Sequence, residues 1–275
     1  MSRTTSKSRG EGAAPILLPI IAIAGLALFL LPLVGMVIRT PWDTAASVFS
    51  DPAIFAALRL SLLVSVTAVV LSLCYGFPMA YLLARTNIPF RRLIRALALL
   101  PMVLPPIVGG IALLSAFGRN GILGPALESI GIHLPYSTAG AILAVTFVSA
   151  PFMVATLEAG LHDLDDRLES AAATLGASRW TIIRRVVIPQ LLPALLAGTA
   201  LTFARALGEF GATIAFAGSM PGRTQTLPLA IYQSLHTNLE GAFLLSVLLL
   251  AVSLVVLIAL RSRIIPATSK RGANR

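Results

Sequence analysis

The chain alternates between long apolar stretches and short polar ones. Each apolar stretch holds the roughly 20 residues that a helix needs to cross about 30 Å of hydrocarbon. Because a spanning segment must satisfy its own backbone hydrogen bonds, each is predicted to be helical. The sequence therefore predicts an all-α integral membrane protein with six transmembrane helices. The six windows are about 15–38, 60–84, 96–117, 137–157, 188–218 and 241–260.

Composition supports a membrane protein. Apolar residues make up 57% of the chain, charged residues 12%, and the mean hydropathy is +0.89. Soluble domains are nearer to about 45–50% apolar and about 25% charged. The first window follows a basic stretch, as the core of a secretory signal would, but it is longer than such a core and no small-x-small cleavage site follows it. We expect it to be a retained span.

The net charge of +10 is explained by membrane topology. If the polar segment 161–187 is cytosolic, 16 of the 21 Lys and Arg residues lie on the cytosolic side, as the positive-inside rule predicts. Both termini are then cytosolic, and residues 1–14 and 263–275 are predicted to be short, disordered basic tails. The remaining five are Arg39, Arg59, Arg119 and Arg223 on the opposite side and Arg205 inside a window.

Proline and glycine interrupt the third window. Proline removes a helix hydrogen bond, and non-helical backbone at membrane depth persists only within protein or beside water. The pattern predicts a broken helix that lines a pathway, or else kinks that only help helices to pack. The interrupting residues are Pro101, Pro105, Pro106, Gly109 and Gly110.

The segment between the fourth and fifth windows is polar and rich in small residues. An acidic run, Asp163 to Asp166, favours a helix start, and alanines and a glycine then present little side-chain bulk. Such a smooth surface would let a groove of another protein approach the backbone closely. The alternative is a solvated helical hairpin.

Residues 169–189 resemble the EAA signature of ABC-importer permeases, the cytosolic loop that binds the ATPase. Aligned on Gly176, the signature's Ala-Ala pair falls on Ala171 and Ala172, and its Leu-Pro falls on Ile188-Pro189. The signature's glutamate falls on Ser170, one residue after Glu169, and one residue turns a helix by about 100°. Either Glu169 supplies this carboxylate or the contact is weaker here. The resemblance assigns ATPase coupling to Glu169, Ser170, Ala171, Ala172, Gly176, Arg179 and Pro189.

The resemblance implies the type I ABC importer transmembrane fold over about residues 55–262 and a transport subunit rather than an enzyme. No Gly-x-x-x-x-Gly-Lys-Ser/Thr motif occurs, so ATP and Mg would be used by a partner ATPase and no cofactor is expected in this chain. The implied partners are a second copy of the chain, the ATPase subunits and an extracytoplasmic binding protein, at the cytoplasmic membrane. The histidines and Cys74 show no metal-ligand spacing.

Arg205 and Glu209 are the charges that lie within the six windows. Charges in a span are costly and rarely face lipid, so they suggest function by default. Arg205 would draw an oxyanion along the pathway while Glu209 holds or shields it, with Gly208 and Gly211 allowing a bend or a close helix contact. The alternative is a structural ion pair that joins two helices.

Residues 204–213 and 217–232 are similar to the corresponding stretch of molybdate permeases, with sulfate permeases as close relatives. The Pro-Gly-Arg-Thr-Gln-Thr-Leu-Pro run from Pro221 favours the molybdate branch. The expected function is molybdate translocation by an ATP-driven importer. Tungstate or sulfate/thiosulfate import is the alternative, and an ion-coupled secondary carrier is a further one.

Overall fold

The computed structural model describes residues 17–264, and this part of the chain is helical with no strand. The predicted tails lie outside the described residues, except that Arg263 and Ile264 end the last helix. The longer helices are α1 (Leu17–Arg39), α3 (Pro52–Arg85), α4 (Arg91–Val103), α5 (Pro106–Phe117), α7 (Thr138–Asp163), α10 (Ile188–Leu207) and α13 (Leu239–Ile264). The shorter ones are α2 (Ala45–Phe49), α6 (Gly124–Ser129), α8 (Asp166–Thr174), α9 (Arg179–Ile182), α11 (Gly211–Ala217) and α12 (Leu227–Thr237).

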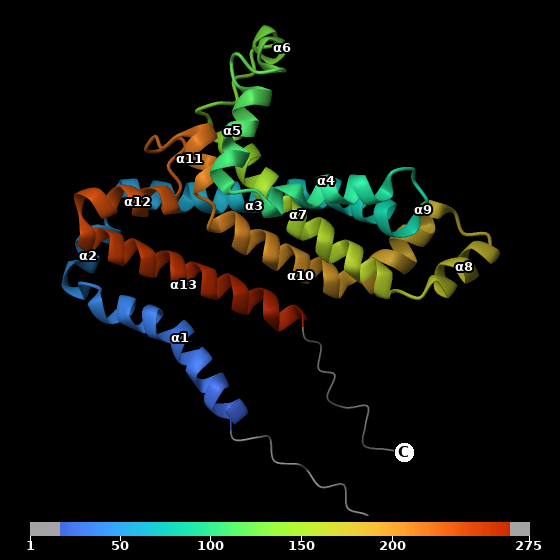
Figure 1. The fold of residues 1–275 in the computed structure, drawn as a ribbon, viewed down its shortest axis with the longest axis horizontal. Helices are drawn as coiled ribbons and strands as arrows, with labels where there is room; N and C mark the ends of the chain where they lie inside the picture. The colour runs from blue at the N-terminus through green and yellow to red at the C-terminus, as the bar shows by residue number, and fades with distance from the viewer. Residues whose placement is uncertain (1–16, 265–275) are drawn as a thin grey trace, which may run out of the picture.

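The predicted membrane fold is confirmed. Among the described residues, five helices are long and apolar enough to cross a membrane, and the bent pair α4–α5 makes a sixth candidate span. α10 packs against both α3 and α13. In Figure 1, α8 and α9 lie near one end of the bundle, and α2 and α12 lie at the other.

The centre of the bundle is formed by α3, α7 and α10, which pack through small residues. Gly76 of α3 and Gly198 of α10 both face Met153 of α7. A Cβ added to Gly76 would lie 3.4 Å from Met153 Cγ, and a Cβ added to Gly198 would lie 3.0 Å from Met153 Sδ. Small residues allow membrane helices to approach closely. The main buried cluster at this end comprises Ala80, Leu83, Met153, Val154, Leu157, Leu161, Ile182, Val187 and Leu191.

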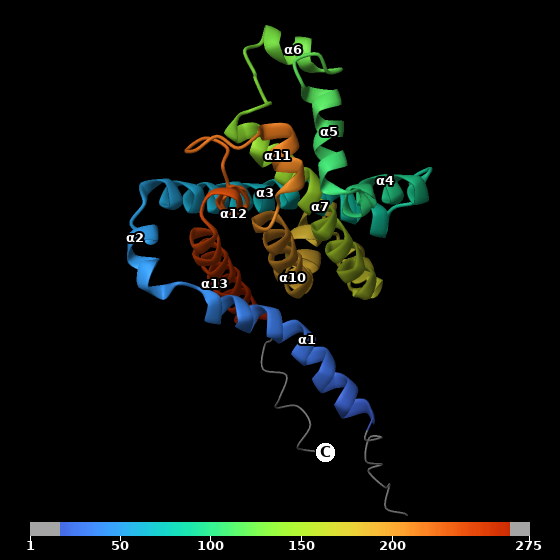
Figure 2. The ribbon, with the colours of Figure 1, turned by 60° about the vertical axis from the view of Figure 1, so that its left-hand side comes forward.

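The first predicted span is a helix that lies outside this bundle. None of the residues of α1 is buried, and its packing neighbour in the bundle is α13. Figure 2 shows α1 diverging from the other long helices, and it also shows α5 and α6 projecting from the opposite side of the bundle. Both projections leave apolar side chains that only lipid or another polypeptide can cover.

The third window is broken, as predicted. The axes of α4 and α5 differ by 117°, and the break lies at Leu104 and Pro105, which both have extended backbone conformations. A residue that precedes proline is driven out of the helical region, and here this holds for two successive residues because Pro106 follows Pro105. Pro106 then begins α5, where its missing N–H costs nothing.

The fifth window differs from the single helix expected over 188–218. It is divided at residues 208–210, so that α10 ends at Leu207 and α11 begins at Gly211. The helix also starts earlier than expected, because α9 continues through a π-helical turn (Ile183–Val187) into α10. Pro189 would crowd a carbonyl four residues back in a regular helix, and the wider turn just before it relieves this.

An ion pair between α4 and α7 holds the α4 half of the broken span against the bundle. Arg95 Nε donates to Glu158 Oε1 at 2.8 Å, Arg95 Nη2 contacts the same oxygen, and the Glu158 side chain is 8% exposed. His162 Nε2 lies 3.8 Å from this oxygen. The sequence did not predict this pair, because both residues lie just outside the apolar windows. Arg95 precedes the window 96–117, and Glu158 follows the window 137–157.

We expect Arg95→Met to destabilise the protein by about 3 kcal/mol, because it leaves the Glu158 carboxylate buried without its guanidinium partner. Arg119→Met is the matched control. Arg119 pairs with Glu128 at 3.4 Å, but their side chains are 79% and 41% exposed, so its loss is worth less than about 1 kcal/mol. Thermal unfolding of both variants in detergent checks this. Equal shifts in Tm would contradict a structural role for the Arg95–Glu158 pair.

Candidate functional site

The two breaks in the membrane helices meet at one place. The end of α10 and the start of α11 lie against the start of α5, and together they surround a hollow of about 370 Å³. The four residues predicted for the pathway all line it. The complete lining is Pro105, Pro106, Ile107, Arg205, Gly208, Glu209, Phe210 and Gly211.

Glycines allow α5 and α11 to touch at this junction. A Cβ added to Gly211 would lie 2.9 Å from Pro106 Cβ and 3.1 Å from the backbone nitrogen of Ile107. On the facing helix, a Cβ added to Gly110 would lie 2.5 Å from Ala215 Cβ. Real Cβ atoms do not approach so closely, so the contact requires glycine at both positions. Gly208 has no such need, because its added Cβ would meet only a carbonyl at 3.7 Å.

Arg205 and Glu209 form an ion pair across the end of α10. Arg205 Nη1 lies 2.6 Å from Glu209 Oε2, and Glu209 Oε1 accepts a hydrogen bond from the backbone N–H of Ala212 at 2.7 Å. The carboxylate therefore also caps the first turn of α11, where negative charge is favourable. Glu209 is almost fully buried, so both of its oxygens are committed to the protein.

The guanidinium of Arg205 retains access to the hollow. Its side chain is 26% exposed, and the guanidinium carries five N–H donors, of which the pair with Glu209 uses those at Nη1. Arg205 lies about 24 Å along the helix from Pro189, near the C-terminal end of α10. A charge at this depth must face protein or water rather than lipid. The arrangement can bind an oxyanion through charge-assisted hydrogen bonds.

The segment predicted to couple to an ATPase forms α8, a turn, and α9. Asp165 caps α8 by accepting from Arg167 N at 3.0 Å. The helix ends in a Schellman motif, in which Ala177 N donates to Ala172 O and Gly176 N donates to Ala173 O. Gly176 has a φ of +80°, and its added Cβ would meet open space. Glycine is thus required at position 176 by backbone conformation, not by contact.

Part of this segment packs on the bundle, and the rest is exposed. Ala172 and Ala177 pack against the main buried cluster, whereas Ala171 is exposed. Leu175 and Trp180 are 88% and 70% exposed. Leu175 lies in the turn after α8, and Trp180 lies at the very start of the candidate span Arg179–Leu207. The sequence analysis missed these two residues, although bulky apolar side chains isolated in a polar segment could have revealed them.

Glu169 and Ser170 point to different sides of α8. Glu169 Oε1 lies 3.1 Å from Arg85 Nε at the end of α3, and the Glu169 side chain is 20% exposed. Ser170 is exposed, and its hydroxyl donates to Asp166 O at 3.0 Å. The other two predicted coupling residues, Arg179 and Pro189, are exposed at the starts of α9 and α10.

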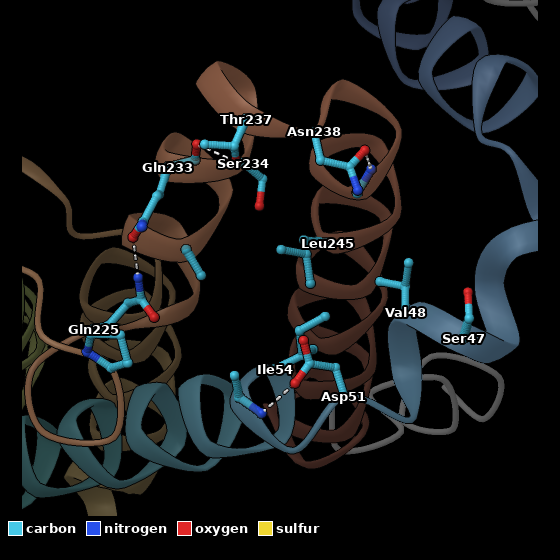
Figure 3. A pocket seen from close by; sticks show the side chains of 14 residues that line it. Ser47, Val48, Asp51, Ile54, Gln225, Gln233, Ser234, Thr237, Asn238 and Leu245 are labelled. Atoms are coloured by element: carbon cyan, nitrogen blue, oxygen red, sulfur yellow. Dashed lines mark hydrogen bonds between the residues drawn. The ribbon is translucent and has the colours of Figure 1, made fainter.

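The end of the bundle opposite α8 carries a separate polar hollow of about 440 Å³, between α2, α3, α12 and α13 (Figure 3). Gln225 Nε2 donates to Gln233 Oε1 at 2.5 Å, and Asp51 Oδ1 accepts from Ala53 N at 2.8 Å. The residues that line this hollow include a carboxylate and no cationic side chain. It is therefore poorly suited to bind an anion, in contrast to the hollow beside Arg205.

Solved structures share this fold. A bacterial ABC transporter involved in the import of the acidic polysaccharide alginate matches with a TM-score of 0.70 and 20% identity, over 90% of this chain and 94% of that one. The inward-facing MetNI methionine ABC transporter matches with a TM-score of 0.59 and 20% identity, over 77% of this chain and 93% of that one. The structure is thus the predicted type I ABC importer transmembrane fold.

Sequence comparison defines the family. Residues 76–270 match the family described as binding-protein-dependent transport system inner membrane component. The chain belongs to this family and is a multi-pass membrane transport subunit. The molybdenum transport system permease protein ModB of Mycobacterium tuberculosis is 46% identical, over 88% of this chain and 92% of its own length. ModB of Escherichia coli is 41% identical, over 77% of this chain and 93% of its own length. The sulfate transport system permease protein CysT of E. coli is 37% identical, over 86% of this chain and 86% of its own length.

We expect Gly211→Ala to destabilise the protein by about 1–3 kcal/mol, because its Cβ would force α11 away from Pro106. Gly208→Ala is the matched control three residues away, and it should change stability by less than about 0.5 kcal/mol. Thermal unfolding of the two variants in detergent measures the difference. If the two alanines were equally well tolerated, the close packing of α5 on α11 would be disproved.

Proposed function

We propose that this chain is the membrane-spanning permease subunit of an ATP-driven importer of molybdate. The observation that carries the proposal is the 46% identity to a molybdenum permease over nearly its whole length. The guanidinium of Arg205, which is exposed to a hollow in the outer half of the membrane, supplies chemistry that suits a tetrahedral oxyanion.

In this proposal, α8 and α9 face the cytosol and both termini are cytosolic. The charge bias of the loops supports this orientation. The exposed side chains of Leu175 and Trp180 would then contact an ATPase subunit. That subunit would bind ATP and Mg. The polar hollow at the opposite end offers a surface for an extracytoplasmic binding protein. One of the matching alginate transporter structures includes a periplasmic protein, which supports such an assembly.

Two copies of the chain would enclose the pathway. The hollow beside Arg205 is open in a single copy, and hydrocarbon cannot cover an exposed guanidinium. A second copy placed across this face would exclude lipid and leave a water-filled path between the two Arg205 side chains. The projecting α6 packs chiefly against α5 within its own chain and would have a protein neighbour in the dimer.

Transport would follow from movement of these parts. Closure of the ATPase pair draws the two coupling helices together and opens the path outward. The anion leaves its binding protein, is attracted by Arg205 and passes between the two copies. Because the Glu209 carboxylate already neutralises part of the charge of the Arg205 guanidinium, the anion is held only weakly and can be released inward. High affinity would reside in the binding protein.

The relatives also favour a second candidate, sulfate or thiosulfate import, because CysT is 37% identical over most of both chains. Molybdate, tungstate and sulfate are all tetrahedral dianions, and Arg205 can bind each of them by charge and hydrogen bonds.

Uptake of labelled molybdate should distinguish these candidates. In cells that lack this chain, adding it back should restore uptake, and an excess of sulfate should reduce that uptake little. Strong competition by sulfate would favour the second candidate. Uptake that continues in vesicles without ATP or the ATPase subunit would instead indicate an ion-coupled carrier.

Arg205→Met is expected to lower molybdate uptake about ten- to a hundredfold, the equivalent of losing a hydrogen bond to a charged group. This variant also leaves Glu209 buried without its partner, so it could fail for structural reasons. The double variant Arg205→Met with Glu209→Gln removes that unpaired charge and keeps an oxygen that can cap α11.

The double variant should assemble normally yet still fail to import molybdate. Recovery of uptake in the double variant would mean that the pair is only structural. Membrane insertion and the amount of assembled complex, measured beside uptake, separate the two results.

Ala171→Trp should abolish co-purification of the ATPase subunit, because it adds bulk to the exposed face of α8 without entering the core. Arg92→Trp, at an exposed position near the start of α4, is the control for bulk on the same side of the membrane. Position 176 is less suitable, since any side chain there strains the helix end. Retention of the ATPase by Ala171→Trp would rule out this face as the coupling surface.

A further inference from the structure

The last residue of α3 is bound to three acceptors of the coupling segment. Arg85 Nη1 forms an ion pair with Asp166 Oδ1, Arg85 Nε lies 3.1 Å from Glu169 Oε1, and Arg85 Nη2 donates to Leu164 O at 3.2 Å. The Arg85 side chain is only 11% exposed. We propose that Arg85 is a positioning residue that transmits the movement of α8 to the transmembrane bundle, and that Glu169 serves this link rather than the ATPase.

The geometry of the Arg85 contacts favours a stiff connection. The planar guanidinium binds acceptors in a fixed fork, so it loses little freedom for each contact that it makes. Asp166 and Glu169 are three residues apart and therefore share one face of α8. Arg85 also stands in the last turn of α3, where a positive charge is favourable, so the pairing stabilises both helix ends.

The Arg85–Glu169 contact is buried, so each of the two charged side chains depends on the other for compensation of its charge. Arg85 Nε and Glu169 Oε1 are each buried, and neither makes a hydrogen bond elsewhere in the described part of the chain. Each atom is therefore compensated by the opposite charge 3.1 Å away. Removing one partner would release the other side chain rather than leave the contact in place.

The remaining attachments of α8 to the bundle are small. Ala172 and Ala177 pack on the main cluster, while most of the other residues of this segment are exposed. Short non-helical links precede and follow α8, at residues 164–165 and 175–178. α8 also contacts α9 and the π-helical turn that leads into α10, so the Arg85 contacts add a second route, through α3, by which a force on α8 reaches the membrane. α3 in turn packs along α7 and α10.

The same geometry explains what becomes of the family's glutamate. The carboxylate of Glu169 is turned inward onto Arg85, and the position aligned with the family's glutamate is an exposed serine, Ser170. The exposed surface of α8 around Ala171 and Leu175 thus carries no carboxylate from either of these two positions.

This inference rests on the proposed coupling of the chain to an ATPase, and the experiment uses the complete importer in vesicles. Import of molybdate and hydrolysis of ATP are measured in the same preparation, together with co-purification of the ATPase subunit. The variants are Arg85→Met, Arg85→Lys and Glu169→Gln, and the control is Arg92→Met, which removes the same charge from an exposed site nearby.

Arg85→Met should keep the ATPase bound and hydrolysing ATP, while the ratio of import to hydrolysis falls about 5- to 150-fold, the usual range of coupling between sites. Arg85→Lys should lie between the wild type and Arg85→Met, because it keeps the charge but loses the fork. Glu169→Gln should lower the same ratio and should also keep the ATPase bound. A protein that was merely less stable would lose import and hydrolysis in proportion, with an unchanged ratio.

An unchanged ratio in Arg85→Met, equal to that of Arg92→Met, would overturn the inference. So would loss of the ATPase from Glu169→Gln but not from Arg85→Met, since the carboxylate would then bind the partner. If Arg85→Met does not fold, a double variant in which the two residues are exchanged, Arg85→Glu with Glu169→Arg, is tested instead. Its ratio of import to hydrolysis should be close to that of the wild type. A double variant that folds but hydrolyses ATP without import would also overturn the inference. Failure of the wild type to bind an ATPase or to need ATP would instead refute the proposed function.

Discussion

A break in a membrane helix exposes backbone N–H and C=O groups that hydrocarbon cannot satisfy, and such breaks persist only where protein or water covers them. Residues 17–264 contain two such breaks, at Leu104–Pro105 and at residues 208–210, and both lie at the same junction. Glycine at positions 110 and 211 brings α5 and α11 into contact, and the Glu209 carboxylate caps the first turn of α11. The charged pair at the junction is therefore part of what makes the broken helices stable.

The parts of the fold that could be predicted from sequence are those set by strong local rules. Six apolar windows predicted six candidate spans, and two successive prolines predicted the break between α4 and α5. The division of the fifth window was not predicted, because Gly208 and Gly211 permit a bend but do not impose one. That bend depends on Pro106, about a hundred residues earlier in the chain, against which Gly211 packs. The Arg95–Glu158 pair joins the edges of two windows, and neither edge shows it alone.

The coupling segment shows a similar division. Its position, its small residues and the importance of Gly176 followed from the resemblance, and the structure adds the reason for the glycine, which ends α8 with a positive φ. The direction of Glu169 could not be predicted, because its partner Arg85 lies over eighty residues away in the sequence. The offset of about 100° between adjacent helical residues left two possibilities open, that Glu169 supplies the family's carboxylate or that the contact is weaker here. The structure assigns each of them to a different face of α8.

The two ends of the proposed importer subunit also use charge differently. At the end of α3, Arg85 is almost fully enclosed by its acceptors and leaves little surface for any other ligand, as expected of a rigid link. At the end of α10, Arg205 shares a carboxylate with the N-terminus of α11 and keeps a quarter of its side chain exposed. A guanidinium that was fully paired could not attract an anion, and one that was unpaired would retain a dianion too strongly for release. Partial compensation by Glu209 thus fits a site that an anion must both enter and leave, while the same carboxylate keeps α11 in place.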